Sequence, residues 1–161
     1  MTLWSREPSV EALRQIEETI RAKSPAATAA EVASLMQRYG RGLAEELDRQ
    51  VQQRRFEIKS GPVHNTSPLP VGLSVLLQAD PNLDFRLGTP QREALVPGRW
   101  LSVRSISEAA GFVKDFIWAF DLGGGNWTGG KLARDGVVFA KIAYSGRITD
   151  IGTGAEINAK S

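Results

Sequence analysis

His64 offers the widest choice of chemistry in this chain, because it is the only histidine among 161 residues. An imidazole titrates near neutral pH and can act as a general acid or base. Ser67, Ser74 or a carboxylate such as Asp80 could complete a hydrolytic constellation with it. The spacing does not require this, since a catalytic triad is recognised by geometry. A loop histidine among Asn, Thr and Ser more often satisfies backbone groups, so catalysis at His64 is an alternative hypothesis.

A glycine-rich segment carries part of a phosphate-binding pattern. Gly125 and Gly130-Lys131 have the spacing of a P-loop, in which backbone amides hold the phosphates of a nucleotide. The last position of the pattern is wrong, because Leu132 stands where a Ser or Thr would bind magnesium. The Asp135-Gly136 turn also follows before a helix could form to direct its N-terminus at the phosphates. We therefore expect neither a nucleotide nor another cofactor.

Trp127 lies in the same segment, with five glycines among residues 123–130. Glycines cannot pack an indole ring, so the ring either folds back onto its own sheet or anchors a partner. The tendency of tryptophan to be buried slightly favours the first alternative. For the second, we expect a mobile loop in which Trp127 and Asn126 become ordered on contact with a partner. Fixing a glycine-rich loop costs entropy that such a contact can offset.

The aspartates are scattered at turns and strand ends, and their spacing matches neither a calcium loop nor a pair of catalytic carboxylates. We interpret most of them as turn-forming residues: Asp80, Asp84, Asp115, Asp121, Asp135 and Asp150. Asp135 is the clearest case, because Asp-Gly supplies the positive φ angles of a tight hairpin turn. The chain has no cysteine, which excludes disulfides and thiolate chemistry, and we expect no metal site.

The charge of the chain is small, with 20 Lys and Arg against 18 Asp and Glu and a net charge of +2. Basic residues gather at one place: Arg38, Arg41, Arg49, Arg54, Arg55 and Lys59. Glu45 lies one helical turn before Arg49 and can pair with it, as on an ordinary solvated helix face. No aromatic pattern accompanies these charges, so a nucleic-acid partner is possible and is not favoured.

Residues 8–56 carry the apolar periodicity of helices. Pro8 suits the first turn of a helix, and Ser24-Pro25 ends the first run. Thr28 and Glu31 have the spacing of a capping box, which predicts that a second helix begins there.

The second helix is predicted to carry one long apolar stripe at the period of an α-helix. Its members are Val32, Leu35, Met36, Tyr39, Leu43, Leu47 and Val51. One helix over 29–55 is expected, with a kink or a break at Gly40 and Gly42; the constant phase of the stripe favours a kink. We expect the stripe to be buried, partly against the sheet and partly against another subunit. Leu43→Ala would then cost about 2–5 kcal/mol.

Residues 61–161 hold 14 of the 16 glycines and six of the eight prolines, and their apolar residues alternate. The alternation predicts strands over 71–79, 83–87, 100–106, 112–122, 137–145 and 147–151. Their connections are too short for parallel crossovers, so an antiparallel sheet of about five strands is expected. Amphipathic helices first and strands afterwards indicate an α+β fold, with a helical segment over 1–60 and a β-rich domain over 61–161 in one cooperative unit.

The longest uninterrupted apolar run, residues 116–120, is far too short to span a membrane, and the N-terminus does not resemble a leader. We expect a cytoplasmic protein without a membrane partner. By elimination, we favour a non-enzymatic protein-interaction or assembly module of a bacterial or phage multiprotein system. The candidate partner-binding residues are Trp127, Asn126, Leu43, Leu47, Val51, Arg54 and Arg55. The alternatives are a small hydrolase-type enzyme using His64 and nearby carboxylates, and a nucleic-acid-binding accessory protein.

Overall fold

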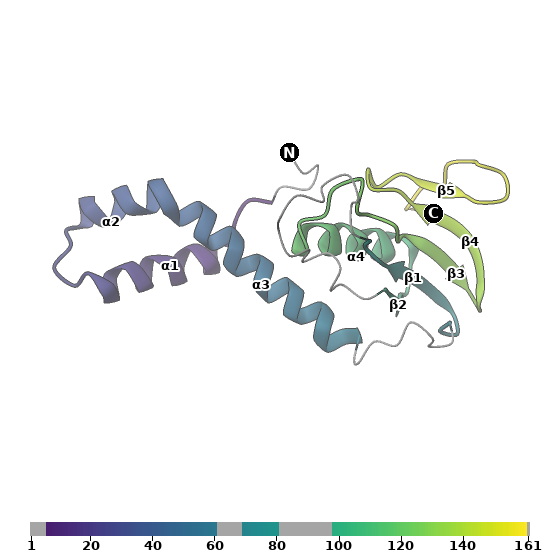
Figure 1. Cartoon of the computed structure of the whole chain (residues 1–161), viewed down its shortest axis with the longest axis horizontal. Coiled ribbons are helices and arrows are strands. Elements are labelled where there is room, and N and C mark those ends of the chain that lie inside the picture. Colours follow the sequence, from purple (N-terminus) through teal and green to yellow (C-terminus); the bar gives the residue numbers. More distant parts are fainter. Residues whose placement is uncertain (1–5, 61–68, 81–97, 161) are drawn as a thin grey trace.

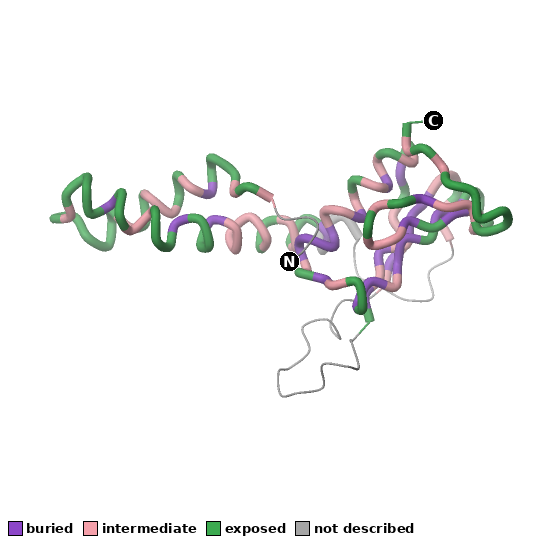
Figure 2. The backbone as a smooth tube through the Cα atoms, turned by 90° about the horizontal axis from the view of Figure 1, so that it is seen from above, coloured by how far each residue is buried: buried purple, intermediate pink, exposed green. Residues whose placement is uncertain are grey.

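The protein consists of a helical arm followed by a domain built on one β-sheet (Figure 1). The computed structural model describes residues 6–60 (57–60 in backbone only), 69–80 and 98–160. The helices of the arm come first and the strands form an antiparallel sheet, so the predicted α+β class is confirmed. Buried residues gather in the sheet domain, while the outer part of the arm is mostly exposed or half-buried (Figure 2).

The arm contains a hairpin of α1 (Val10–Lys23) and α2 (Ala29–Leu35). Ser9 caps α1, since its hydroxyl accepts a hydrogen bond from the Ala12 amide. The predicted capping box of α2 is confirmed. The Thr28 hydroxyl accepts from the Glu31 amide, and the Glu31 carboxylate accepts from the Thr28 amide at 2.7 Å. Both caps satisfy amides that the start of a helix leaves without a partner.

Thr28→Ala is expected to lower the free energy of unfolding by about 1 kcal/mol, because it removes half of the capping box. The Thr28 amide and hydroxyl donate to Glu31 and hold its pKa below the ordinary value of 4.5. A group with a lowered pKa stabilises the fold above its unfolded pKa and loses this contribution as the pH falls through its folded pKa. The effect of Thr28→Ala, measured by denaturant unfolding, should therefore shrink below about pH 4. An equal effect at neutral and acidic pH would contradict this.

Helix α2 continues through a π turn, η1 (Met36–Gly40), into α3 (Arg41–Ser60). Met36 and Arg41 keep right-handed helical dihedral angles, so the predicted continuity of the helix over 29–55 is confirmed. A π turn adds one residue to a helical turn. Gly40 is buried there, and a Cβ atom on it would lie 2.8 Å from the Met36 side chain. The glycine therefore marks a π turn and not a break.

The predicted burial of the apolar stripe is only partly correct. It is buried at Val32 and half-buried at Leu35, Met36 and Leu47. Tyr39, Leu43 and Val51 are 59%, 51% and 47% exposed. These three side chains stay exposed because α1 covers only a narrow side of α3. The buried residues on these two helices near their contact are the small Ala12 on α1 and Ala44 on α3. We now expect Leu43→Ala to cost about 1 kcal/mol or less in denaturant unfolding.

The sheet of the described residues has five strands, as the sequence predicts. They are β1 (Leu73–Leu77), β2 (Arg99–Ser102), β3 (Lys131–Arg134), β4 (Val137–Ile142) and β5 (Ile148–Asp150). Their order is β2-β1-β3-β4-β5, and every neighbouring pair is antiparallel. Asp135 and Gly136 join β3 to β4 with φ angles of 50° and 82°, which confirms the predicted hairpin turn.

One predicted strand is wrong, because the segment expected as a strand over 112–122 belongs largely to α4 (Ile106–Ala119). A continuous apolar run does not distinguish a buried helix from a buried strand. The signal that identifies the helix is Ser105 with Glu108 three residues later: the Ser105 hydroxyl accepts from the Glu108 amide. Strand β3 is absent from the predicted strands. Its four residues come directly after the glycine-rich segment, so the sequence shows no separate alternating run there. The predicted strand over 83–87 lies outside the described residues.

Helix α4 connects the arm to the sheet, because it contacts both α3 and β1. Phe116 of α4 is fully buried. Its ring lies 5.4 Å from that of Phe56 on α3 and 6.0 Å from that of Trp127, measured between centroids. The second half of α3 is therefore part of the core of the sheet domain, and its first half belongs to the arm.

Candidate functional site

Five of the seven residues predicted to bind a partner lie together on one side of α3. The surface that we call the α3 face consists of Leu43, Leu47, Gln50, Val51, Arg54 and Arg55. All of them except Leu43 line an open cavity of about 380 Å³. Leu43, Leu47 and Val51 follow one another at four-residue spacing, which puts them on the same side of a helix. The structure thus assembles the apolar and basic candidates of this helix into one surface.

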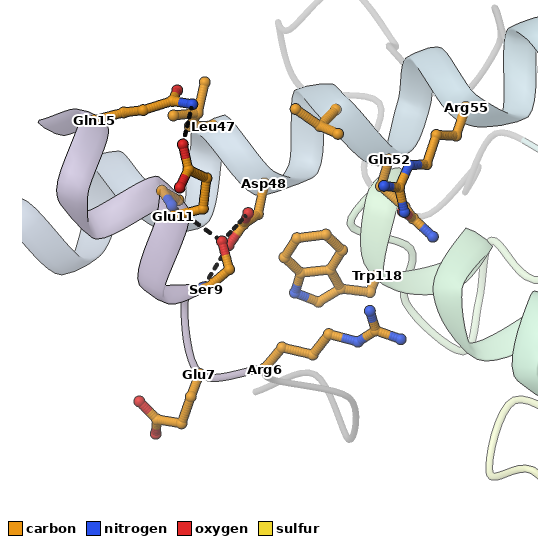
Figure 3. A pocket seen from close by; sticks show the side chains of 12 residues that line it. Arg6, Glu7, Ser9, Glu11, Gln15, Leu47, Asp48, Gln52, Arg55 and Trp118 are labelled. Carbon is orange, nitrogen blue, oxygen red and sulfur yellow. Dashed lines mark hydrogen bonds between the residues drawn. The ribbon is translucent and has the colours of Figure 1, made fainter.

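A second cavity, of about 350 Å³, adjoins the α3 face (Figure 3). We call it the junction pocket, and it is lined by the start of α1 with the residues before it, the middle of α3, and Trp118 of α4. It shares Leu47, Val51 and Arg55 with the α3 face. Figure 3 shows the Trp118 ring between Arg6 and α3. The α3 face is therefore continuous with a hollow beside α4.

The junction pocket exists because α1 begins partway along α3. The Asp48 carboxylate accepts hydrogen bonds from the Ser9 amide at 2.8 Å and from the Ser9 hydroxyl at 2.7 Å. This pair fixes the N-terminus of α1 beside Asp48, where a carboxylate is also favoured by the helix dipole. Val51 and Arg55, which follow Asp48 along α3, are exposed.

Trp118 of α4 makes contacts that hold the arm against the sheet domain. The residue is 6% exposed, and the guanidinium groups of Arg6 and Arg49 lie over its ring at 5.5 and 5.7 Å from the centroid. Arg6 also forms an ion pair with Asp115 on α4. The Gln53 side chain donates to a backbone carbonyl at the end of α4 at 2.6 Å, which satisfies a group that a helix end leaves without a partner. These contacts fix the direction of α3 relative to the sheet domain.

The α3 face differs in charge from the rest of the arm. The described arginines before the sheet that form an ion pair are Arg6, Arg14, Arg21, Arg41 and Arg49. Arg38, Arg54 and Arg55 are exposed and have no ion pair among the residues that the structure describes. Their guanidinium groups keep planar donor sets available for an anionic group. Of the basic cluster predicted over 38–59, Arg41 and Arg49 are thus neutralised by ion pairs.

The carboxylates and hydroxyls of the junction pocket are engaged in structural contacts. The Ser9 hydroxyl both donates to Asp48 and accepts from the amide that it caps. Arg14 and Gln15 donate hydrogen bonds to Glu11 and lower its pKa. Among the described residues, no group of three or more His, Cys, Asp and Glu could hold a metal ion. Among the described residues that line the pocket, the Gln52 and Arg55 side chains form no hydrogen bond or ion pair.

The residues considered for a hydrolytic site do not meet in the described part of the chain. Ser74 is fully buried in β1, whereas Asp80 is exposed and lies six residues further along. Extended chain of that length spans about 20 Å. His64 and Ser67 lie outside the described residues. The structure therefore gives no geometric support to catalysis by Ser74 with Asp80.

Trp127 and Asn126 lie in the core, which confirms the slightly favoured alternative that the Trp127 ring folds back onto its own sheet. The prediction of a mobile loop that becomes ordered on contact with a partner is wrong. Each is 7% exposed. The indole Nε1–H donates to the Ile142 carbonyl at 3.2 Å, and the Asn126 amide donates to a backbone carbonyl after β1 at 3.3 Å. The glycines permit this packing, because a Cβ atom on Gly129 would lie 2.8 Å from the indole ring. Because Gly129 has no side chain, the Trp127 ring can pack directly against the backbone of the sheet.

The phosphate-binding spacing lies in a segment that pairs with β1. The amides of Gly129 and Gly130 donate to the carbonyls of Gln78 and Leu76 at 3.1 and 2.7 Å. Amides used in this way cannot also hold a phosphate. We expect Lys131→Ala to leave the melting temperature in magnesium with ATP or GTP unchanged, since a bound ligand at 100 times its Kd would add about 2.7 kcal/mol. A nucleotide-dependent rise that the substitution abolishes would contradict this.

In comparisons with known proteins, no family model, no curated protein and no solved structure matches this chain. None of the helices in the described residues combines the length and the hydropathy that a bilayer-spanning segment needs. The chemistry of the chain's own surface is therefore the basis for a functional proposal.

Proposed function

We propose that this chain is a non-enzymatic protein-interaction or assembly module whose α3 face binds another protein. The observation that carries the proposal is that Leu43 and Val51 are about half exposed on the helix that also presents Arg54 and Arg55, which have no ion pair within the described part of the chain. Apolar residues gathered on one surface are typical of interaction sites. The cytoplasmic location predicted from the sequence belongs to the same proposal.

The distribution of exposed apolar residues supports this choice of surface. The exposed large hydrophobic residues of the described chain are Val10, Tyr39, Leu43, Val51, Val71, Val137 and Ile151. Three of them belong to the stripe on η1 and α3, and the others are dispersed over different elements. Single exposed hydrophobic residues are common on any protein, whereas a row along one helix is not. Covering the row would contribute about 25 cal/mol for each Å² of apolar surface.

The attachment of α3 to the sheet domain also supports a binding role. The contacts of Trp118 with Arg6 and Arg49, and the packing of Phe56 on Phe116, hold the helix in one direction. A partner would meet a surface that is already ordered, so less conformational entropy is lost on binding. The sheet domain then acts as the support for the arm.

A photo-reactive amino acid at position 51 of the full chain, in cells of the organism that encodes it, tests this proposal. Val137 is the matched control, because it is also an exposed valine (69%) but lies on β4. Irradiation is expected to join one defined protein to position 51 and none to position 137, with the joined peptides identified by mass spectrometry. No adduct at position 51, or the same adducts at both positions, would contradict the proposal.

A further inference from the structure

We infer that the partner segment bound by the α3 face is an amphipathic helix with carboxylates along one edge of its apolar side. This inference rests on the proposed function and adds the chemistry of the partner. It follows from the charge, the spacing and the shape of the α3 face.

The charge of the α3 face calls for an acidic partner. Arg54 and Arg55 are exposed beside the apolar Leu47 and Val51, and none of the described residues that line the cavity shared by these four is acidic. Most other arginines of the arm already form an ion pair with a carboxylate; Arg49, for example, pairs with Glu46. A carboxylate from outside would supply the missing partner, and a guanidinium can hold it with two parallel hydrogen bonds.

The spacing of the apolar residues calls for a helix. Leu43, Leu47 and Val51 occur once per turn and span about 12 Å along the axis, and Arg54 and Arg55 extend the surface by one further turn. Another helix laid along α3 places its own four-residue ridges between such residues. Apolar side chains in the middle of that helix would meet Leu47 and Val51. Carboxylates at its edge would reach the two arginines.

A second copy of this chain fits the α3 face less well. An antiparallel pairing centred on Leu47 would bring Arg55 to the level of Tyr39 in the second copy, next to Arg38. A parallel pairing in register would bring Arg54 beside its own equivalent. In both of these arrangements like charges are opposed, which is unfavourable. An acidic chain avoids this repulsion, so charge complementarity favours it.

A nucleic acid or a lipid surface also fits less well. Phosphates would pair with Arg54 and Arg55 but would leave Leu43 and Val51 in water, because backbone contacts are made with charged and polar groups. A bilayer would need a broad apolar face, whereas α3 is covered by α1 on one side and by α4 on another. An acidic amphipathic helix covers the apolar row and neutralises the arginines together.

Two synthetic peptides of about 20 residues, long enough to form a helix, test this chemistry on the full chain. The acidic peptide repeats Glu-Leu-Ala-Glu-Leu-Ala-Glu, and the basic peptide has Lys at every Glu position. By fluorescence anisotropy near 0.1 M salt, we expect the acidic peptide to bind at least about tenfold more tightly. Arg54→Glu with Arg55→Glu should reverse this preference. Lys131→Glu with Lys141→Glu, a pair of exposed cations facing each other across β3 and β4, should leave it unchanged.

The outcomes separate this inference from the proposed function. Equal binding of both peptides, tighter binding of the basic peptide, or binding of neither overturns the inference. The inference is also overturned if duplex DNA or a phosphatidylglycerol vesicle binds through Arg54 and Arg55 while the acidic peptide does not bind. In each of these cases a defined protein cross-linked at position 51 would leave the proposed function standing. A cross-link to a second copy alone overturns the acidic-helix inference and keeps the assembly role.

Discussion

Replacing Trp127 with alanine is expected to lower the free energy of unfolding by about 3–5 kcal/mol, because it empties a large site in the core. The indole ring is 7% exposed, lies 6.0 Å from the Phe116 ring between centroids, and donates its Nε1–H to Ile142. Alanine removes the ring contacts and leaves that carbonyl without its side-chain donor. Denaturant unfolding of the purified chain, followed by far-ultraviolet circular dichroism, measures the loss.

Trp127→Phe is the matched control for this substitution. It keeps an aromatic ring in the core but removes the Nε1–H donor and part of the ring volume, so a loss of about 1–3 kcal/mol, smaller than that of Trp127→Ala, is expected. Binding at the α3 face should be unchanged in Trp127→Phe, because the ring has no part in that surface. A stable Trp127→Ala variant with weakened association would mean that the ring contacts a partner, and would contradict the structure.

Gly130→Ala is expected to be at least as damaging, at about 4 kcal/mol or more. Gly130 has a φ angle of +84°, and a Cβ atom there would overlap the Ile142 carbonyl oxygen. The backbone cannot move aside, because the Gly130 amide donates to Leu76 and its carbonyl accepts from the Ile142 amide, each at 2.7 Å. The substitution therefore breaks the contact of this segment with both β1 and β4. Thermal unfolding and soluble yield measure the effect.

Gly136→Ala separates backbone strain from steric overlap. Gly136 has nearly the same φ angle, +82°, but no atom lies within 4 Å of the added Cβ. Only the cost of a left-handed alanine remains, about 1–2 kcal/mol. Similar losses at Gly130 and Gly136 would show that the close approach of Gly130 to β4 is wrong.

Local sequence signals predicted the elements that depend on local contacts. The capping box of Thr28 and Glu31 and the turn at Asp135-Gly136 each involve neighbours within four residues, and the structure contains both. Amphipathic periodicity likewise predicted a continuous helix over 29–55. The antiparallel arrangement followed from the short connections between strands.

The errors concern residues whose environment is set by distant parts of the chain. The predicted strand over 112–122 rested on the continuous apolar run at residues 116–120, which alone does not distinguish a helix from a strand. The signal of the helical period of α4 was one polar face, shared by the side chains of Ser107, Glu108, Lys114 and Asp115. The glycines around Trp127 in the sequence left a partner contact open as an alternative to packing on its own sheet. The real neighbours of Trp127, Phe116 and Ile142, come from α4 and β4. Sequence spacing alone does not show that small residues can admit a large ring.

Part of the candidate site could likewise be predicted from local sequence signals, and part could not. Leu43, Leu47, Val51, Arg54 and Arg55 could be predicted, because helical spacing alone places them on neighbouring turns of one helix. The junction pocket could not, since it needs the N-terminus of α1, Asp48 and Trp118 to meet from three parts of the chain. The one signal in the sequence was Pro8, which was predicted in the first turn of the helix but precedes the Ser9 cap of α1. Pro8 does not reveal where on α3 that start is held.

The most direct test of the proposed binding surface is the affinity of the full chain for the protein identified by cross-linking at position 51. Val51→Glu puts a charge on the α3 face, and Val137→Glu puts the same charge on β4. We expect Val51→Glu to weaken binding at least about tenfold while Val137→Glu binds like the unchanged chain, with similar melting temperatures for all three proteins. Equal affinity of the Val51→Glu variant and the unchanged chain would show that the α3 face does not bind the partner.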